Sequence, residues 1–284
     1  MPDEYKIPVT ALVVTRNEEP RLATALAALQ PFEQIIVADS HSTDNTTVIA
    51  RNMGAEVIDF DWNGQYPKKR QWCLDHLSFR HDWVFMVDAD EIVTPELCAE
   101  IQQALERDKA RNIAGYFIRG QYARNGKVLH FGMKNNKLAL FDRHKFMYPV
   151  VDDLDIEGMG EIEGHYQPVL REPYHGAGIG ALRCALIHDA YGCDNGASWM
   201  ARHKKYAHWA AMMDRRDAWP QEPYKKRRML KAMFHALPLQ PLAAFIHSYI
   251  LKLGALDGVQ GFLFARDRYR YYKMIAAEKK ALSA

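Results

Sequence analysis

The chain has few cysteines, four in 284 residues, and no two of them form a C-x-x-C pair. This scarcity excludes a small secreted domain held by disulfides, and the scattered positions exclude a zinc site of paired cysteines. We therefore expect reduced thiols. An excess of charge of one sign is also missing, because 37 basic residues face 35 acidic ones. The net charge of the whole chain gives no indication of a nucleic-acid partner.

The N-terminus lacks the basic start and apolar run of a signal peptide, so we expect a protein of the cytoplasmic side. No repeat or low-complexity tract interrupts the first half of the chain. Hydrophobic residues make up 48% and charged residues 25%, which is the balance of a chain with a buried core. Disordered and collagen-like classes are thereby excluded.

Short apolar runs alternate with segments of helical spacing. Four runs read as buried strands, and they cover residues 9–15, 34–38, 56–60 and 83–87. Apolar strands separated by helices are typical of a parallel sheet that is covered on both faces. We expect an α/β fold with further strands between residues 110 and 150.

Polar side chains follow three of these strands. Right-handed crossovers place the carboxyl ends of parallel strands at one edge of the sheet, where ligands bind in such folds. The sequence therefore predicts that these side chains gather at one edge: Thr15, Asn17 and Glu18; Asp39, Ser40, Ser42 and Asp44; Asp88, Asp90 and Glu91.

Asp88-Ala89-Asp90 comes directly after the fourth apolar run. In an extended segment, residues two apart project to the same side, so the two carboxylates repel each other unless a cation lies between them. Mg²⁺ and Mn²⁺ prefer such oxygen ligands and complete their shell with substrate phosphates. The alternative is a helix start, because Thr94-Pro95-Glu96 opens the next helix and acidic residues favour that position.

Two further segments have a functional and a structural interpretation. The turn that begins at Asp39 offers a carboxylate to a nucleotide base or ribose, or it satisfies its own backbone. Lys68-Lys69-Arg70 offers cations to phosphate oxygens, or it forms a solvated face.

Four motifs occur in a specific order: VVTRNEE, VADSHSTDNTTVIARNMGAEVIDFDW, KKRQWCL and WVFMVDADEIVTPEL. In order and spacing they resemble glycosyltransferase family 2, whose members are inverting enzymes of the GT-A fold. The likeness is strongest to the bacterial branch that builds lipopolysaccharide core and related cell-envelope glycans, and it is dense over residues 8–105. The resemblance implies a Rossmann-like, mostly parallel sheet, a nucleotide-sugar donor, a divalent metal (Mn²⁺ or Mg²⁺) and inversion at the anomeric carbon.

The resemblance also implies roles for single residues. Thr15 and Glu18 match the first-strand contacts to the nucleoside, and Asp39 matches the acidic residue that recognises base or ribose. Arg70 stands where the family has a basic residue facing the diphosphate. Asp88 and Asp90 match the D-x-D motif, with Asp90 preferred as the metal ligand. The donor site is completed by its neighbours in the same motifs, Asn17, Ser40 and Ala89. One departure is His41, where family members often have glycine.

Transfer with inversion needs a carboxylate that accepts the proton of the acceptor hydroxyl. The candidates lie downstream of the D-x-D motif: Asp152, Asp153, Glu161 and Glu163. Glu163 is preferred, because Gly164 permits a tight turn and His165 is placed to orient the carboxylate. A solvated acidic loop is the alternative for each of the four.

Two patterns are set aside. Residues 176–181 fit a dinucleotide-binding G-x-G-x-x-A pattern, but the segment before them reads as a loop where that fingerprint needs a strand. A phosphatase-type D-x-D is disfavoured, because that nucleophile normally follows the first strand. His188-Asp189 reads equally as a structural pair or as a catalytic one.

We place a catalytic domain at residues 1–195 and a basic, amphipathic helical region at 196–284. Residues 202–231 carry ten basic and three acidic side chains, and residues 232–251 carry none of either. The apolar stretch is too interrupted for a spanning helix. Such a tail suits an anionic membrane surface, so we expect peripheral attachment to the inner face of the cytoplasmic membrane and a lipid-linked saccharide acceptor. A helical cap on the core is the alternative, and RNA binding is disfavoured.

The leading hypothesis is thus a metal-dependent, inverting glycosyltransferase. A nucleotidyltransferase shares the sheet and the metal but releases pyrophosphate instead of a nucleoside diphosphate. A non-catalytic, membrane-associated carbohydrate-binding module keeps the fold without turnover.

Overall fold

In the computed structural model the chain divides into two compact units. Unit 1 comprises Met1–Gln121, Asn135–Pro149 and Glu161–Asp189, and unit 2 comprises Tyr122–Lys134, Val150–Gly160 and Ala190–Ala284. The structure describes residues 6–108, 111–153, 155–156, 159–163, 166–189, 191, 196–220, 222, 224–235 and 237–283. Gly164 and His165, invoked above for Glu163, and Cys193 lie outside these residues.

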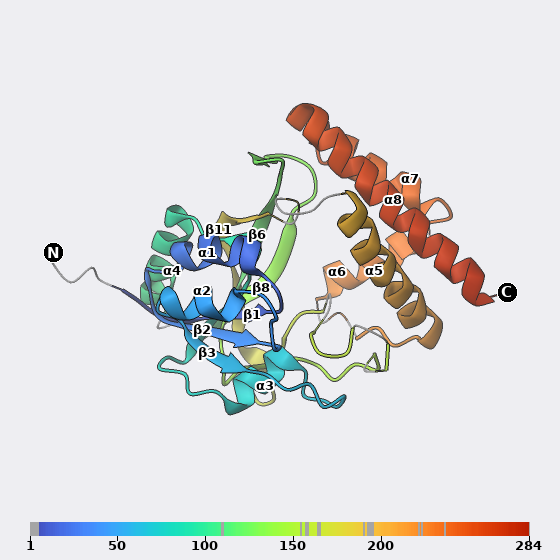
Figure 1. Ribbon diagram of the computed structural model, residues 1–284. Coiled ribbons are helices and arrows are strands. Elements are labelled where there is room, and N and C mark those ends of the chain that lie inside the picture. Colours follow the sequence, from blue (N-terminus) through green and yellow to red (C-terminus); the bar gives the residue numbers. More distant parts are fainter. Residues whose placement is uncertain are drawn as a thin grey trace. The chain divides into compact units, whose positions relative to one another are not determined.

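Unit 1 opens with four parallel strands, in the spatial order β3-β2-β1-β4. They are β1 (Ile7–Thr15), β2 (Phe32–Asp39), β3 (Glu56–Asp59) and β4 (Trp83–Asp88). The helices that follow them in turn are α1 (Glu19–Ala28), α2 (Thr46–Asn52), α3 (Lys69–His76) and α4 (Pro95–Arg107). Strand and helix alternate along the chain as the apolar runs predicted, which confirms the α/β class (Figure 1).

The sheet continues beyond β4 with antiparallel pairing. Its further strands, in spatial order, are β8 (Asn135–Asp142), β6 (Ile113–Arg124), β11 (Gly178–His188) and β5 (Glu91–Ile92). Short elements complete unit 1: β9 (Phe146–Met147), β10 (Val169–Leu170) and η1 (Tyr174–Gly176). The glycine-rich pattern at 176–181 leads into β11, so a strand follows it where a dinucleotide fingerprint requires a helix.

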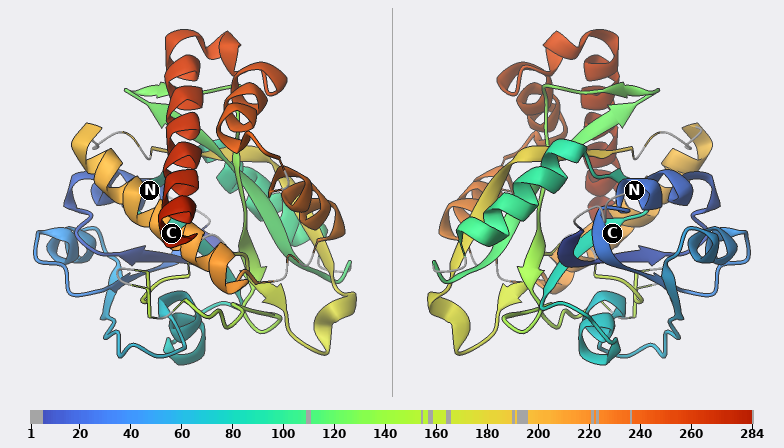
Figure 2. Two further views of the ribbon diagram at one scale, coloured as in Figure 1. Left: turned by 90° about the vertical axis from the view of Figure 1, so that its right-hand side faces the viewer. Right: turned by 90° about the vertical axis from the view of Figure 1, so that its left-hand side faces the viewer.

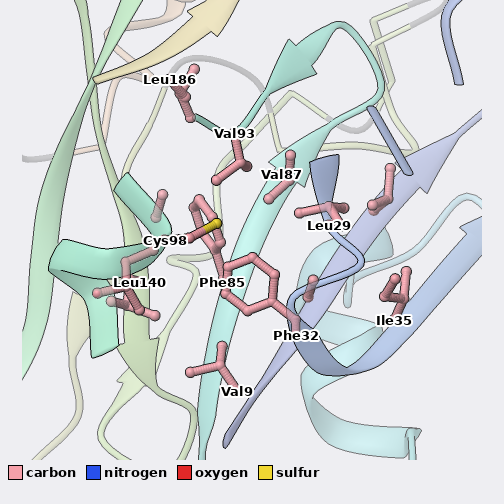
Figure 3. Packing of buried hydrophobic residues seen from close by; sticks show 14 of the residues in the cluster. Val9, Leu29, Phe32, Ile35, Phe85, Val87, Val93, Cys98, Leu140 and Leu186 are labelled. Carbon is pink, nitrogen blue, oxygen red and sulfur yellow. The ribbon is translucent and has the colours of Figure 1, made fainter. Parts of the chain in front are cut away.

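Alternation along the parallel strands fills both faces of the sheet. In β4, Phe85 and Val87 pack with residues of α1 and α4, whereas Val84 and Met86 pack with residues of α3. Figure 3 shows the first of these layers, in which Phe32 and Phe85 meet with ring centroids 5.6 Å apart. Because both faces of these strands are covered, successive side chains are all apolar, and the strands appear in the sequence as continuous apolar runs.

Each face of unit 1 also holds a buried thiol. Cys73 of α3 belongs to one layer and Cys98 of α4 to the other. Burial raises the pKa of the Cys73 thiol to about 12 and that of Cys98 to about 11. Cys73, Cys98 and Cys184 are free.

Unit 2 is mainly helical. Its elements are β7 (Lys127–Val128), α5 (Gly196–Arg216), α6 (Lys225–His235), α7 (Gln240–Ile246), η2 (His247–Leu251), η3 (Gly254–Asp257) and α8 (Gly258–Ser283). The long helix α8 packs along α5 and α7, as both views of Figure 2 show. The predicted C-terminal helical region is thereby confirmed.

Two earlier segments of the chain are built into unit 2. Arg124 donates a 2.5 Å hydrogen bond to Asp267 of α8. Trp209 of α5 donates its indole N–H to Asp153 at 3.3 Å, and both side chains are buried. Segments 122–134 and 150–160 thus take part in the core of the helical unit.

No single helix within the described ranges has the length and apolar character to cross a bilayer. One pair passes the same test jointly, Gln240–Leu251 with Gly254–Ser283, and it is bent by 72°.

Candidate functional site

Strand register brings the predicted residues together at one edge of the sheet. Thr15 of β1 is paired with Asp39 of β2, and Val14 of β1 is paired with Asp88 of β4. The three strands therefore end side by side, and the D-x-D motif lies next to the end of β1.

Asp39 organises the turn after β2. It is fully buried, and its carboxylate accepts hydrogen bonds from the Thr15 hydroxyl at 2.8 Å, the Ser42 hydroxyl at 2.6 Å and the Ser42 amide at 2.7 Å. The backbone amide of Ser40 donates to the Thr15 carbonyl at 3.0 Å. The structural interpretation of the turn is thus present, and base or ribose recognition by Asp39 stays a prediction.

The loop after β1 is fastened to the same turn. The side-chain oxygen of Asn17 accepts a hydrogen bond from the Thr43 backbone amide at 2.8 Å, and the Asn17 backbone amide donates to the Ser42 hydroxyl at 2.7 Å. Asn17 and His41 have φ of 56° and 51°, a region that favours glycine. The positive φ explains why a glycine suits the position of His41. The Glu18 amide donates to Thr46 at 2.8 Å.

Two cations hold the first carboxylate of the D-x-D motif. Arg70 donates to one oxygen of Asp88 at 2.7 Å, and Lys137 of β8 donates to the other at 3.1 Å. Burial raises the pKa of Asp88, but Lys137 and Arg70 outweigh it and leave the pKa well below its usual range. Lys137 also donates to Glu91, which is fully buried. Ala89, between the two acids, is buried as well.

The second carboxylate has a different environment. His188, the last residue of β11, places Nε2 3.3 Å from Asp90 Oδ2, and Arg21 of α1 lies 3.7 Å from the same oxygen. Burial lowers the pKa of His188, but Asp90 outweighs it and raises the pKa above its usual value. When its imidazole is neutral, His188 offers one nitrogen donor beside the Asp90 oxygen, a set that Mn²⁺ accepts.

The described residues contain no ready group of three or more metal-binding side chains. Mg²⁺ and Mn²⁺ often bind through one or two protein ligands plus substrate phosphates, so the pair Asp90–His188 fits such an ion. Asp88, whose two oxygens face Arg70 and Lys137, fits it less well. The helix start predicted at Thr94-Pro95-Glu96 is confirmed, because Thr94 caps α4 by accepting the Leu97 amide at 3.2 Å. Asp88 and Asp90 precede this cap and do not cap the helix themselves.

The basic run 68–70 is not a solvated face. Lys68 and Lys69 are buried, and Lys69 donates to the Thr15 carbonyl at 3.1 Å. Burial lowers the pKa of Lys69. Arg70 turns its guanidinium toward Asp88, and that carboxylate raises the arginine pKa against the effect of burial. The run therefore directs positive charge to the edge where the D-x-D motif lies.

Glu163 caps the first turn of α3. Its two carboxylate oxygens accept the amides of Arg70 at 3.0 Å and Gln71 at 2.9 Å. The side chain is buried, and burial raises its pKa. A general base must reach a substrate hydroxyl, so this geometry argues against the preference for Glu163 and assigns it a positioning role.

The other three candidate bases differ in access. Glu161, in unit 1, is 20% exposed and lies 3.2 Å from Arg16. Asp152, in unit 2, is 80% exposed, so its carboxylate is open to solvent. Asp153 is fully buried against Trp209. Of the four, only Glu161 and Asp152 present an accessible carboxylate.

Sequence reasoning missed Lys137 and left the role of His188 open. Lys137 precedes an apolar run and reads as an ordinary strand residue. Its contact with Asp88 depends on the antiparallel pairing of β8 with β4, which no sequence motif announces. His188 reaches Asp90 because the end of β11 pairs with β5, directly after the D-x-D motif.

Comparison with known proteins gives one family. The sequence model described as glycosyl transferase family 2 matches residues 10–171. An uncharacterised glycosyltransferase of Rickettsia typhi is 30% identical over 141 residues, which is 48% of this chain and 46% of the relative. The lipopolysaccharide core biosynthesis glycosyltransferase LpsC of Rhizobium meliloti is 32% identical over 91 residues, 30% of this chain and 33% of LpsC. The chain thus spans less than half the length of these curated relatives.

Among solved structures, glucosyl-3-phosphoglycerate synthase of Mycobacterium tuberculosis in complex with phosphoglyceric acid is similar with a TM-score of 0.44. It is 16% identical, and the match covers 76% of this chain and 82% of that one.

Proposed function

The chain belongs to glycosyl transferase family 2, and on that premise we propose that it transfers a sugar from a nucleotide-sugar donor to a saccharide acceptor with inversion at the anomeric carbon. The observation that carries the proposal is the strand register. It places Thr15, Asp39 and Asp88 at one sheet edge, with Arg70 directed toward Asp88.

The donor is bound at this edge. The nucleoside lies against the turn of Asp39 and Ser40 and the loop of Asn17 and Glu18, which are fastened to each other. Arg70 faces the diphosphate, because a guanidinium matches phosphate oxygens in two parallel hydrogen bonds. Its contact with Asp88 keeps it oriented before the donor arrives.

A divalent metal would be held by Asp90 and His188, with Asp88 beside them. When bound, such an ion supplies Lewis-acid stabilisation of the charge that develops on the leaving diphosphate. Arg70 adds positive charge at the same place from the protein itself. These fixed charges stabilise a transition state in which the bond to the anomeric carbon breaks.

The acceptor hydroxyl attacks from the opposite face and gives its proton to a carboxylate. Asp152 and Glu161 are the candidates whose carboxylates are accessible. Substituting each by its amide distinguishes them: loss of the true base lowers kcat by about 10²–10⁴ and leaves donor affinity unchanged.

We further propose a lipid-linked saccharide acceptor, a role in cell-envelope glycan synthesis and attachment to the inner face of the cytoplasmic membrane. The similarity to LpsC, which is named as a lipopolysaccharide core biosynthesis glycosyltransferase, supports the first two. The basic helix α6, which carries five lysines and arginines over Lys225–His235, supports the third.

The donor site is tested by calorimetric titration with UDP, GDP, dTDP and ADP, with and without Mn²⁺. We expect one nucleotide to bind, and to bind more tightly with the metal. Asp90→Asn should remove the metal-dependent part of the affinity. Asp82→Asn is the matched control, because Asp82 precedes β4 at the opposite end of the strand and is 70% exposed. Equal binding with and without metal would contradict the metal site.

The products decide between reaction classes. Release of a nucleoside diphosphate from the sugar nucleotide supports the proposal, whereas release of pyrophosphate from a nucleoside triphosphate indicates a nucleotidyltransferase. Donor binding without any turnover indicates a binding module.

A further inference from the structure

Exposed apolar side chains are concentrated in one part of unit 2. The described residues include nineteen large hydrophobic side chains that are exposed, and thirteen of them fall between residues 229 and 262. Single exposed leucines are ordinary on a protein surface, but a contiguous group of this kind marks an interaction site.

The most exposed members lie where the chain reverses between α7 and α8. Through η2 and η3 the two helices are joined at one end of a hairpin, and they lie side by side in both views of Figure 2. We call this end the apolar apex and define it by six side chains between 43% and 71% exposed: Ile250, Leu251, Leu253, Leu256, Val259 and Phe262.

The apex is held in a fixed shape by backbone contacts. Asp257 is buried, and its carboxylate accepts the amides of His130 at 3.0 Å and Phe131 at 2.9 Å. The Gly132 amide donates to the Lys252 carbonyl at 2.8 Å. The apolar side chains of the apex are therefore exposed on a backbone that these hydrogen bonds hold in place.

The charge around the apex has one sign. Residues 247–266, from η2 into α8, contain two basic residues, Lys252 and Arg266, and a single acid, which is Asp257. Because the Asp257 carboxylate is buried, the described segment 247–266 exposes no carboxylate of its own. Lys252 lies within the apex and is exposed. Arg266 follows Val259 by seven residues, or about 10 Å along the axis of α8.

We propose that the apolar apex inserts into the surface of an anionic lipid bilayer, with its leucines below the headgroups and Lys252 and Arg266 at the level of the phosphates. Interfacial helices bury their apolar face roughly 5–10 Å deep, which matches the separation of Val259 from Arg266. The inference deepens the membrane attachment proposed above and rests on it. A second copy of the chain fits less well, because a symmetric contact would bring like charges together.

The test is flotation of the full chain with vesicles of phosphatidylcholine alone and of phosphatidylcholine mixed with phosphatidylglycerol. We expect the protein to float with the anionic vesicles, and the triple variant Leu251→Ser, Leu256→Ser, Val259→Ser to bind them at least about tenfold more weakly. Val48→Ser, Val150→Ser, Met200→Ser is the matched control, because these three side chains are also exposed and lie outside the apex. The control should float like the parent.

Three results would overturn the inference: equal flotation of the apex variant and the parent, no flotation of the parent with anionic vesicles, or a parent dimer in sedimentation velocity that the apex variant converts to a monomer. Nucleoside diphosphate affinity is measured on all three proteins and should be unchanged in the apex variant. If the parent floats but neither binds a nucleotide nor releases a sugar, the proposed transferase activity fails while the membrane surface stands.

Discussion

At the scale of single residues, the first acid of the D-x-D motif is a charge already balanced by the protein. Arg70 and Lys137 each contact one of its oxygens, so Asp88 brings little free negative charge to the donor site. Within the described part of the chain, the Asp90 carboxylate has His188 and a more distant Arg21 beside it. Asp88 and Asp90, two positions apart, thus have different surroundings: Asp88 holds Arg70 and Lys137, and Asp90 is the acid that we propose as the ligand of a divalent metal.

Lys137 should contribute strongly to stability. We expect Lys137→Met to lower the free energy of unfolding by about 3 kcal/mol, because it leaves the buried Glu91 carboxylate without its cation. Urea unfolding measures the change. The double variant Lys137→Met, Glu91→Gln should lose less than the single one, and a single variant within 1 kcal/mol of the parent would show that the contact is dispensable.

Asp108, after the last turn of α4, should make the stability of the fold sensitive to acid. Its hydrogen bond from Arg107, and then that from Tyr116 at 2.7 Å, lower its pKa against the effect of burial. A pKa lower in the folded than in the unfolded chain stabilises the fold above about pH 4 and loses that effect as the pH falls. Between about pH 5 and pH 2, the parent should therefore lose more unfolding free energy than Asp108→Asn. Parallel pH profiles would contradict this.

At the scale of elements, the sequence predicted what depends on burial alone. The four apolar runs became β1 to β4, because strands buried on both faces leave a pattern that needs no partner to be recognised. Strand β11 was not predicted: it begins among glycines and is largely half-buried or exposed. The burial of Lys68 and Lys69 was equally hidden, because it results from contacts with segments more than fifty residues away.

The same limit applies to the site. The residues that end β1, β2 and β4 were found, because parallel topology alone brings strand ends together. Lys137 and the capping role of Glu163 were not, because each depends on a contact between segments tens of residues apart.

The packing of η3 against α8 should tolerate no side chain at Gly261. A Cβ there would lie 1.9 Å from the Gly254 carbonyl oxygen, which is backbone and cannot rotate away. We expect Gly261→Ala to destabilise unit 2 by about 1–3 kcal/mol, read as a lower melting temperature. Gly176→Ala, where no atom lies within 4 Å of the added Cβ, is the matched control. Equal melting of the two variants would refute the expectation.

At the scale of the whole molecule, the helical unit is assembled from three separate parts of the chain. Besides α5 to α8 it includes Tyr122–Lys134 and Val150–Gly160. The division expected at residue 195 remains a prediction, and a truncated chain tests it.

We expect a chain ending at residue 195 to be unstable and prone to aggregate. It would lack Trp209, Asp257 and Asp267, the partners of the two segments that remain. Circular dichroism and size-exclusion chromatography give the readout. A monomeric fragment that melts cooperatively at the parent temperature would instead support residues 1–195 as an independent domain.

The reaction rates of the two buried thiols of unit 1 would report how often each layer of the sheet opens. Cys73 and Cys98 lie on opposite faces of the sheet and react only when their layer opens, since burial keeps both thiols protonated. If the sheet opens as one body, Ellman's reagent should modify both thiols at one rate in a Cys184→Ser, Cys193→Ser variant, which contains no other thiol. Two unequal rates would reveal that one layer peels from the strands before the other.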